Sequence, residues 1–440
     1  MPVTVTLGGD PVYTYAATAP IPENLDEYLL AGFLRRKKVE LVRCLSNDLE
    51  VPSDVDFVVE GYVDPSEELI REGPFGDHTG FYSLAGFFPR FHVTCITHRK
   101  NAIYPATIVG IPPQEDGWIG KATERIFLMP LKMTIAPEIV DMHMPVEGVF
   151  HNLAFVSISK QYPGQAIKVM NSLWGAGQMM FNKIMVITDA GTNLRDYPTM
   201  SRIISDSVDP LNDVHFIRGT MDILDHSSSG YAYGSKIGID ATRKFAQELS
   251  APPSVTNLDE KGEGEHPGKP MIQAGLIRQA FPETGTINTD LLSAGISCVI
   301  IPIKKSKKHH VRQVATELLL KEWVSRVKFL IFVDDLVDSN VFSGIVWIVS
   351  NNIDPIRDCF HIDQSPGMKF HELCIDGTRK TRNFDDFDRD WPNVIVMNDQ
   401  TIRSVDAKWQ SLGLGPLIPS PSNLYKSLVT NSGAMVKDDF

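Results

Sequence analysis

The chain contains an internal repeat, and this repeat restricts the possible folds more than any other sequence feature. Three pairs of segments match without a gap at an offset of 145 residues, namely 154–160 with 299–305, 181–189 with 326–334, and 208–213 with 353–358. A fourth pair, 238–244 and 374–380, follows at an offset of 136, so the second copy has lost nine loop residues. A shared offset of this kind predicts two copies of one structural unit.

Each copy has the pattern of a βαβ unit. In the first copy, buried-strand patterns at 153–159 and 183–189 flank a helical pattern at about 163–180. We therefore predict two homologous α/β units, at 146–250 and at 290–440, with a terminal helix at 401–412 in the second. The segment 251–289 begins with a stretch rich in Pro, Glu and Gly and is predicted to be a linker. Chance similarity between two βαβ units is the alternative.

The first 145 residues have a different character, with alternating strand patterns and few helices. Strands are predicted at about 1–8, 39–45, 55–63, 91–98 and 104–110, and helices at about 23–34 and 118–131. This region is predicted to form a mainly antiparallel sheet or barrel that carries helices. The predicted fold class is therefore α+β and α/β, with two α/β domains after a β-rich domain.

Two carboxylates, Glu72 and Asp77, frame a turn of sequence Glu-Gly-Pro-Phe-Gly-Asp. Pro74 removes a backbone donor and the two glycines favour tight geometry, so a helix cannot pass through this stretch. If the turn folds back, the two acids approach each other, and repulsion in a poorly solvated site raises at least one pKa. A carboxyl that keeps its proton near neutral pH can act as a general acid. The alternative is an acidic surface turn.

Composition and charge exclude several classes of function. The 440 residues are 43% hydrophobic and carry a formal charge of -12, which argues against a nucleic-acid partner. The longest apolar runs, 341–349 and 296–303, are too short to span a bilayer. Five cysteines are scattered without a CxxC pair, which favours a reduced, cytoplasmic setting and argues against structural zinc.

Several ordered blocks resemble the UbiD family of decarboxylases. They are 2–8, 19–22 with Glu27, 42–52, 72–82 and 234–244. The resemblance is greatest to the 3-polyprenyl-4-hydroxybenzoate carboxy-lyases, which have Asp at the position of Asp77. It implies a partial split β-barrel of the flavin-reductase type and non-oxidative decarboxylation of an aromatic or α,β-unsaturated acid, with a polyprenyl-hydroxybenzoate or related quinone precursor as substrate. The implied cofactor is prenylated flavin mononucleotide (FMN), delivered by a prenylflavin synthase.

The resemblance also implies roles for individual residues. Glu72 matches the first catalytic carboxylate, and Asp77 matches the residue that donates and accepts the proton. Glu27 matches a ligand of the divalent metal, manganese or magnesium, and a monovalent cation is a further candidate cofactor. Ile119 matches an apolar residue near the flavin ring, and Lys183 is the candidate for the flavin phosphate. Without the resemblance, Glu27 would be a solvated helix residue, Lys183 an exposed cation and Ile119 a core residue.

The chain departs from the family pattern in two ways. An upstream region that supplies an Asn and a His to the metal and an Arg to the first carboxylate has no match, so it lies upstream or on another chain. His78, His92 and His98 are not replacements, because a lone His on a strand or turn is more often structural. The second α/β unit is also additional and is expected to serve packing or homo-oligomerisation. The alternative function is therefore a catalytically silent, truncated homologue that acts as an oligomerisation module.

Overall fold

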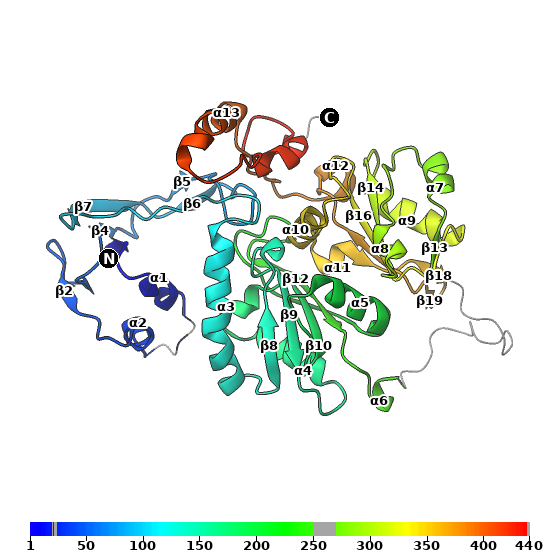
Figure 1. The fold of residues 1–440 in the computed structure, drawn as a ribbon, viewed down its shortest axis with the longest axis horizontal. Helices are drawn as coiled ribbons and strands as arrows, with labels where there is room; N and C mark the ends of the chain where they lie inside the picture. Colours follow the sequence, from blue (N-terminus) through cyan, green and yellow to red (C-terminus); the bar gives the residue numbers. More distant parts are fainter. Residues whose placement is uncertain (20, 22–23, 250–269, 438–440) are drawn as a thin grey trace. The chain divides into compact units, whose positions relative to one another are not determined.

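The computed structural model describes residues 1–19, 21, 24–249 and 270–437. The chain divides into two compact units (Figure 1). The first consists of Met1–Pro74 and Ala85–Ile108, and the second of Phe75–Leu84 and Val109–Phe440. The acidic turn is therefore divided, because Glu72 belongs to the first unit and Asp77 to the second. No helix in the described ranges is long and apolar enough to cross a membrane.

The first unit is built on an antiparallel sheet of three strands. Its elements are β1 (Pro2–Leu7), α1 (Val12–Ala17), α2 (Glu27–Arg35), β2 (Leu41–Arg43), β3 (Glu50–Pro52), β4 (Phe57–Val63), β5 (Ile70–Glu72), β6 (Gly86–Phe88) and β7 (Phe91–His98). The sheet order is β1-β4-β7, and β2–β3 and β5–β6 form separate two-stranded ribbons. The predicted strand at 104–110 is wrong, because these residues form no ladder. Pro105 removes a donor that such a ladder would need.

The first sheet of the second unit has five strands. They are β8 (Ile139–His143), β9 (Leu153–Ile158), β10 (Ile184–Asp189), β11 (Val214–Thr220) and β12 (Tyr233–Asp240), in the order β11-β12-β10-β9-β8. Strands β9, β10 and β12 are parallel, whereas the edge strands β8 and β11 are antiparallel to their neighbours. The helices of this region are α3 (Glu115–Thr134), α4 (Gln165–Trp174), α5 (Tyr197–Ser207) and α6 (Ala246–Leu249).

The second sheet has four strands in the order β14-β16-β20-β17. Its strands are β14 (Cys298–Ile303), β16 (Phe329–Asp334), β17 (Cys359–Phe360) and β20 (Leu373–Asp376). The small strands β13 (Met271–Ile272), β15 (Val324–Ser325), β18 (Asp363–Ser365) and β19 (Met368–Lys369) form two further ribbons. The helices are α7 (Ala274–Ala280), α8 (Asp290–Ser293), α9 (His310–Leu320), α10 (Phe342–Asn352), α11 (Pro355–Asp358), α12 (Arg382–Asp385) and α13 (Asp399–Lys408).

The two sheets repeat the same pairing in the same register. Ile184 of β10 lies opposite Leu153 of β9, and 145 positions later Phe329 of β16 lies opposite Cys298 of β14. In both sheets the third parallel strand carries an antiparallel partner on its outer side. All six residues of β9 and of β14 are buried, as expected for parallel strands covered on both faces. The matching offset in the sequence therefore corresponds to matching topology.

Four apolar clusters lie in the described part of the second unit, and one of them packs Phe81 against α10. One cluster packs α4 onto the first sheet, and another packs α9 onto the second sheet. A central cluster joins residues of both sheets, among them Phe155, Val186, Phe329 and Leu373. The two copies therefore share one buried core, and neither is a free-standing layer.

Reciprocal polar contacts also join the two copies. Lys183, just before β10, donates to the carbonyl of Asn351 at the end of α10, 3.4 Å away. Its counterpart Lys328, just before β16, donates to the carbonyl of Asp206 near the end of α5, also at 3.4 Å. Positive charge at a helix carboxyl end is favourable because unpaired carbonyls point there. The same contact is therefore made twice, once in each direction.

The matching segments 238–244 and 374–380 form the same clamp at the carboxyl end of each third parallel strand. Thr242 donates its amide and hydroxyl to the Asp240 carboxylate, and Thr378 does the same to Asp376. Lys380 then donates to the carbonyls of Asp376 and Thr378, at 2.8 and 2.7 Å. This motif is thus explained by local structure in both copies.

The linker and terminal helix were predicted with mixed accuracy. Residues 251–269 of the expected linker 251–289 lie outside the described residues. The remainder carries β13 and α7, and Ile277 of α7 lies in the core of the second sheet. The predicted helix at 401–412 corresponds to α13 followed by a short 3-10 helix, Trp409–Leu412.

The buried clamp of the second copy predicts a stability effect. Lys380 is 2% exposed and lies 3.2 Å from Asp376 Oδ1 and 3.6 Å from Asp358 Oδ1. Removing the ammonium with Lys380→Met leaves the buried Asp376 carboxylate with its hydrogen bonds from Thr378 but without its cationic partner, while Asp358 keeps Arg357. The free energy of unfolding should therefore fall by about 3 kcal/mol. Urea denaturation followed by circular dichroism measures the change. Lys307→Met, at an exposed position, is the control and should change stability by less than about 0.5 kcal/mol.

Candidate active site

The turn that carries Asp77 is closed by backbone hydrogen bonds and anchored to α10. The Gly80 amide donates to the Asp77 carbonyl at 3.1 Å, and Gly80 has a φ of +86° that favours glycine. Trp347 Nε1 in α10 donates to the Thr79 carbonyl at 2.7 Å, and its ring stacks on Phe81 at 5.0 Å between centroids. A side chain at Gly80 would meet this tryptophan ring. The turn is therefore rigid and largely buried.

Asp77 is a buried carboxylate that is held in its charged form. Its Oδ2 accepts hydrogen bonds from the Thr79 hydroxyl at 2.8 Å and the Thr79 amide at 3.2 Å, and its Oδ1 lies 3.0 Å from His78 Nδ1. Burial alone would raise the pKa of Asp77, but His78 and Thr79 together lower it to about 2. The expectation that an acid of this turn has a raised pKa is therefore wrong for Asp77. Repulsion between carboxylates does not dominate here.

His78 links Asp77 to a second histidine. His78 Nε2 lies 3.0 Å from His151 Nε2, and the His78 ring also stacks on Phe150. Burial alone would lower the pKa of His78, but its contact with Asp77 raises it. In contrast, burial and the neighbouring charge of His78 lower the pKa of His151 to about 4. These directions favour the proton on His78 over His151, and a protonated His78 can donate to Asp77 on one side and to a neutral His151 on the other.

Sequence reasoning missed two members of this cluster, His151 and Asp116. His151 is half-buried in the connection before β9, and its buried Nδ1 has no hydrogen-bond partner among the described residues. Asp116, in the first turn of α3, has a buried Oδ2 without such a partner, and burial raises the pKa of Asp116. No local pattern marks either residue, because 73 positions separate His151 from His78. Only the folded chain brings them to the same turn.

The structure places the other two predicted acids in the first unit. Glu72 is the last residue of β5, opposite Gly86 of β6, and it is exposed. Glu27 is the first residue of α2 and is exposed as well. Over the described ranges, no group of three or more His, Cys, Asp or Glu side chains is arranged to hold a metal ion. Glu27 could therefore supply one ligand, but the described residues do not form a metal site by themselves.

Lys183 and Ile119 lie in the second unit in different settings. Lys183 is 1% exposed, and its ammonium contacts Asp225 Oδ2 at 2.7 Å, Ser227 Oγ at 3.0 Å and the Asn351 carbonyl. These three partners use all three N–H donors of a lysine, so a phosphate would have to displace a buried ion pair. Ile119 lies half-buried in α3, one turn after Asp116. The described residues therefore do not present Lys183 as a free phosphate ligand.

Comparison with known families identifies the family of this chain. A profile described as "UbiD: 3-octaprenyl-4-hydroxybenzoate carboxy-lyase Rift-related domain" matches residues 1–112. A second profile, "UbiD_C: 3-octaprenyl-4-hydroxybenzoate carboxy-lyase C-terminal domain", matches 117–241 and 268–379. The chain belongs to the UbiD family. Each segment matched by the C-terminal profile contains one of the two repeated sheets.

The chain is also similar to curated relatives and to solved structures. An uncharacterised protein of Helicobacter pylori (strain J99) is 38% identical over 93% of this chain and 62% of its own length. The chain spans about half the length of other curated relatives, at 48% and 49% identity. The closed form of vanillic acid decarboxylase from Sedimentibacter hydroxybenzoicus is 27% identical and superimposes with a TM-score of 0.51 over 61% of this chain and 55% of that chain. The UbiD-class enzyme HmfF from Pelotomaculum thermopropionicum, solved with FMN, is 26% identical over 61% of this chain and 57% of that chain, with a TM-score of 0.48.

The buried histidines predict how stability depends on pH. Burial lowers the pKa of His151 to about 4 and that of His226 to about 3, whereas an unfolded histidine titrates near 6.5. Between pH 6.5 and about 4 the unfolded chain therefore binds protons that the folded chain does not, and stability falls as the pH is lowered. His78 has the opposite sign, because its raised pKa stabilises the folded chain at low pH.

We expect the two neutral histidines to outweigh His78. Urea denaturation at pH 7.0, 5.5 and 4.5 should therefore give a decreasing free energy of unfolding. Measurements above pH 4.5 avoid the window in which Asp77, with its pKa of about 2, loses its charge. A free energy of unfolding that increased from pH 7.0 to 4.5 would contradict the assignment of neutral His151 and His226.

Proposed function

We propose that this chain is a carboxy-lyase of the UbiD type that removes the carboxyl group of an aromatic or α,β-unsaturated acid. The observation that carries the proposal is the Asp77–His78–His151 chain on a rigid, buried turn. Decarboxylation leaves a carbanion equivalent that must take up a proton, so the site needs a buried group that can deliver one. Family membership and the likeness to a vanillic acid decarboxylase support an aromatic acid as substrate.

Asp77 and His78 divide the handling of the proton between them. Asp77, with a pKa of about 2, is an acceptor at neutral pH, and His78 holds the proton next to it at 3.0 Å. A proton delivered to the reacting carbon through Asp77 is then replaced from His78, and neutral His151 receives the second hydrogen bond of His78. In the resting state Asp77 is therefore an unprotonated carboxylate. It receives the proton from His78 and passes it on, and it does not store the proton itself.

The family's cofactor, prenylated FMN, supplies an electron sink for the departing carboxylate when it is bound. Ile119 is our candidate for an apolar contact with its ring, and Glu27 for one metal ligand, with manganese or magnesium as the oxygen-preferring ion. Because Lys183 is enclosed by Asp225, Ser227 and Asn351, the phosphate and the metal need ligands beyond Glu27 and Lys183.

The remaining assignments rest on the family alone. Glu72 is proposed as the first catalytic carboxylate, beside Asp77, and the β-sheet of the first unit as part of a split barrel that receives the flavin. The two repeated sheets are proposed as two α/β domains. A 3-polyprenyl-4-hydroxybenzoate or a related quinone precursor is the proposed substrate, a prenylflavin synthase the proposed supplier of the cofactor, and a homo-oligomer the proposed assembly. Glu72 carries an exposed carboxylate, so its role requires that the substrate cover it.

Substitution of Asp77 tests the proposed function. The chain is co-expressed with a prenylflavin synthase and incubated with 3-prenyl-4-hydroxybenzoate, and loss of the acid is followed by chromatography. Asp77→Asn keeps the size of the side chain but cannot carry the proton, so turnover should fall by about 100-fold or more. His78→Gln should lower turnover less and shift the pH at which half of the activity is lost. Flavin absorbance of each purified variant should stay unchanged.

Asp64→Asn is the matched control, because Asp64 is an exposed acid that caps its own turn in the first unit. It should retain full turnover. If Asp77→Asn turns over as fast as the unsubstituted chain, the proposed role of Asp77 is refuted. If the unsubstituted chain binds no flavin and releases no carbon dioxide, the silent oligomerisation module becomes the better description.

A further inference from the structure

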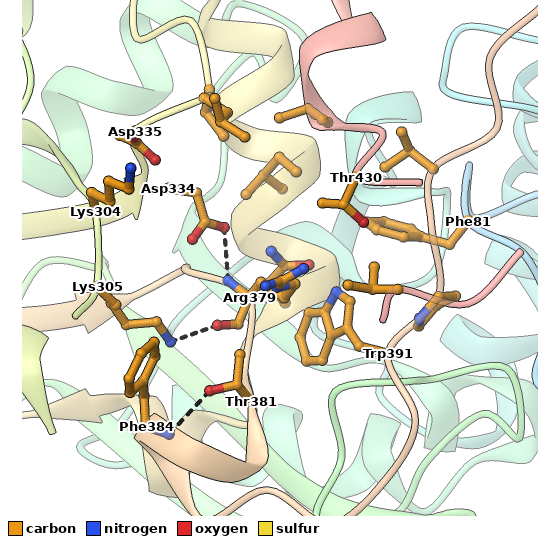
Figure 2. A pocket seen from close by; sticks show the side chains of 18 residues that line it. Phe81, Lys304, Lys305, Asp334, Asp335, Arg379, Thr381, Phe384, Trp391 and Thr430 are labelled. Atoms are coloured by element: carbon orange, nitrogen blue, oxygen red, sulfur yellow. Dashed lines mark hydrogen bonds between the residues drawn. The ribbon is translucent and has the colours of Figure 1, made fainter. Parts of the chain in front are cut away.

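A pocket of about 200 Å³ opens at the carboxyl ends of the parallel strands of the second sheet (Figure 2). Lys304 follows β14, Asp334 ends β16, and Arg379 lies just after β20, so all three strand ends contribute to its lining. Open α/β sheets bind ligands at the carboxyl ends of their strands. The opposite wall is formed by Phe81 and by residues near the end of the chain, such as Trp391.

Cations without partners line one side of this pocket. Over the described residues, the guanidinium of Arg379 and the ammonium of Lys304 have no hydrogen bond or ion pair, although both residues line the pocket. The backbone of Arg379 is fixed on both sides, because its amide donates to Asp334 Oδ2 at 2.8 Å and its carbonyl accepts from Lys305 Nζ at 2.5 Å (Figure 2). The guanidinium is therefore held at the pocket by a rigid backbone and is left free to bind.

Two carboxylates and one ion pair also lie at this pocket. Lys305 is paired with Asp385 at 2.6 Å, so that pair is neutral. Burial raises the pKa of Asp334, although Lys305 and Arg379 oppose this shift. Asp335 is an exposed acid at the rim. Arg379 and Lys304 thus provide two unpaired cations against the carboxylates of Asp334 and Asp335.

The remaining wall is apolar and includes aromatic rings. Phe81, Ile348, Trp391 and Val394 are each at most 6% exposed, and all four line the pocket. A dry cavity of roughly 150 Å³ with apolar walls can hold a benzene ring. A pocket of about 200 Å³ therefore has room for one ring with a small charged group. Arginine forms two parallel, charge-assisted hydrogen bonds with a planar carboxylate. It therefore binds a carboxylate more strongly than a neutral polar group.

We infer that this pocket is a binding site for a small aromatic carboxylate, with the carboxylate on Arg379 and the ring against Phe81 and Trp391. The site lies on the second copy of the repeat, and its residues include none of Asp77, His78 and His151. It does not depend on the proposed decarboxylase activity, because its binding needs neither flavin nor metal. Phe81 lies four residues after Asp77, so a ligand in this pocket would contact the turn that carries Asp77.

The first copy of the repeat offers an internal control. Arg243 matches Arg379 and makes the same backbone contact, since its amide donates to Asp189 Oδ2 at 2.7 Å. However, Arg243 is exposed, and it does not line the pocket at Arg379. Arg243→Gln therefore removes an equivalent charge from an equivalent turn without touching the proposed site.

Binding of sodium benzoate to the flavin-free chain tests the inference. Isothermal titration calorimetry should give one saturable site, and the fluorescence of Trp391 should change on binding. Benzyl alcohol, which lacks the charge, and inorganic phosphate, which lacks the ring, should each bind at least about 10-fold more weakly. Arg379→Gln should weaken benzoate binding by about 10-fold or more, whereas Arg243→Gln should leave it unchanged.

Thermal unfolding of both variants shows that the fold is kept, which we expect because neither guanidinium has a partner to lose. Trp391→Phe should abolish the fluorescence change and keep benzoate affinity within about three-fold, because the aromatic wall remains. The inference is overturned if benzoate shows no saturable binding or if Arg379→Gln binds benzoate as tightly as the unsubstituted chain. Phosphate binding as tight as benzoate binding would also overturn it, since the site would then recognise an anion alone.

Discussion

The hydrogen bond from Trp347 Nε1 to the Thr79 carbonyl fixes the turn on which the candidate site depends. Both groups are buried, so loss of the indole donor would leave the carbonyl unpaired at a cost of about 1–3 kcal/mol. Trp347 belongs to α10, in the second copy of the repeat. The second copy therefore positions Asp77 and His78, and this structural task explains part of its presence without a second catalytic centre.

Once the turn is fixed, neighbouring groups with opposite pKa shifts set its chemistry. Asp77 is charged because His78 and Thr79 together outweigh burial, and His151 is neutral because burial and His78 act in the same direction. A proton shared along this chain is thus concentrated on His78. A site of this kind depends on exclusion of water, since solvent would screen the interactions that separate the pKa values.

The repeat is used for two different purposes. The Asp-Thr clamps and the reciprocal lysine contacts occur in both copies and hold the shared core together. Lys183 belongs to this structural set, because Lys328 makes the same contact from the other copy. The pocket at Arg379, however, lies on the second copy, and the matching Arg243 of the first copy is exposed. The pocket's aromatic wall comes from Phe81 and Trp391, which lie outside the repeated segments.

The sequence by itself determined the repeat, the neighbouring parallel strands β9 and β10 with their counterparts β14 and β16, and the acidic turn, because periodicity, a constant offset and Gly-Pro chemistry are local properties. It also determined the family, through ordered blocks that the family profiles match. Only the tertiary structure decided the partners of each charge. His151 meets His78 across 73 residues and Trp347 meets Thr79 across 268, and no local pattern encodes such distant contacts. The pKa of Asp77 was mispredicted for this reason, since burial and distant partners set it.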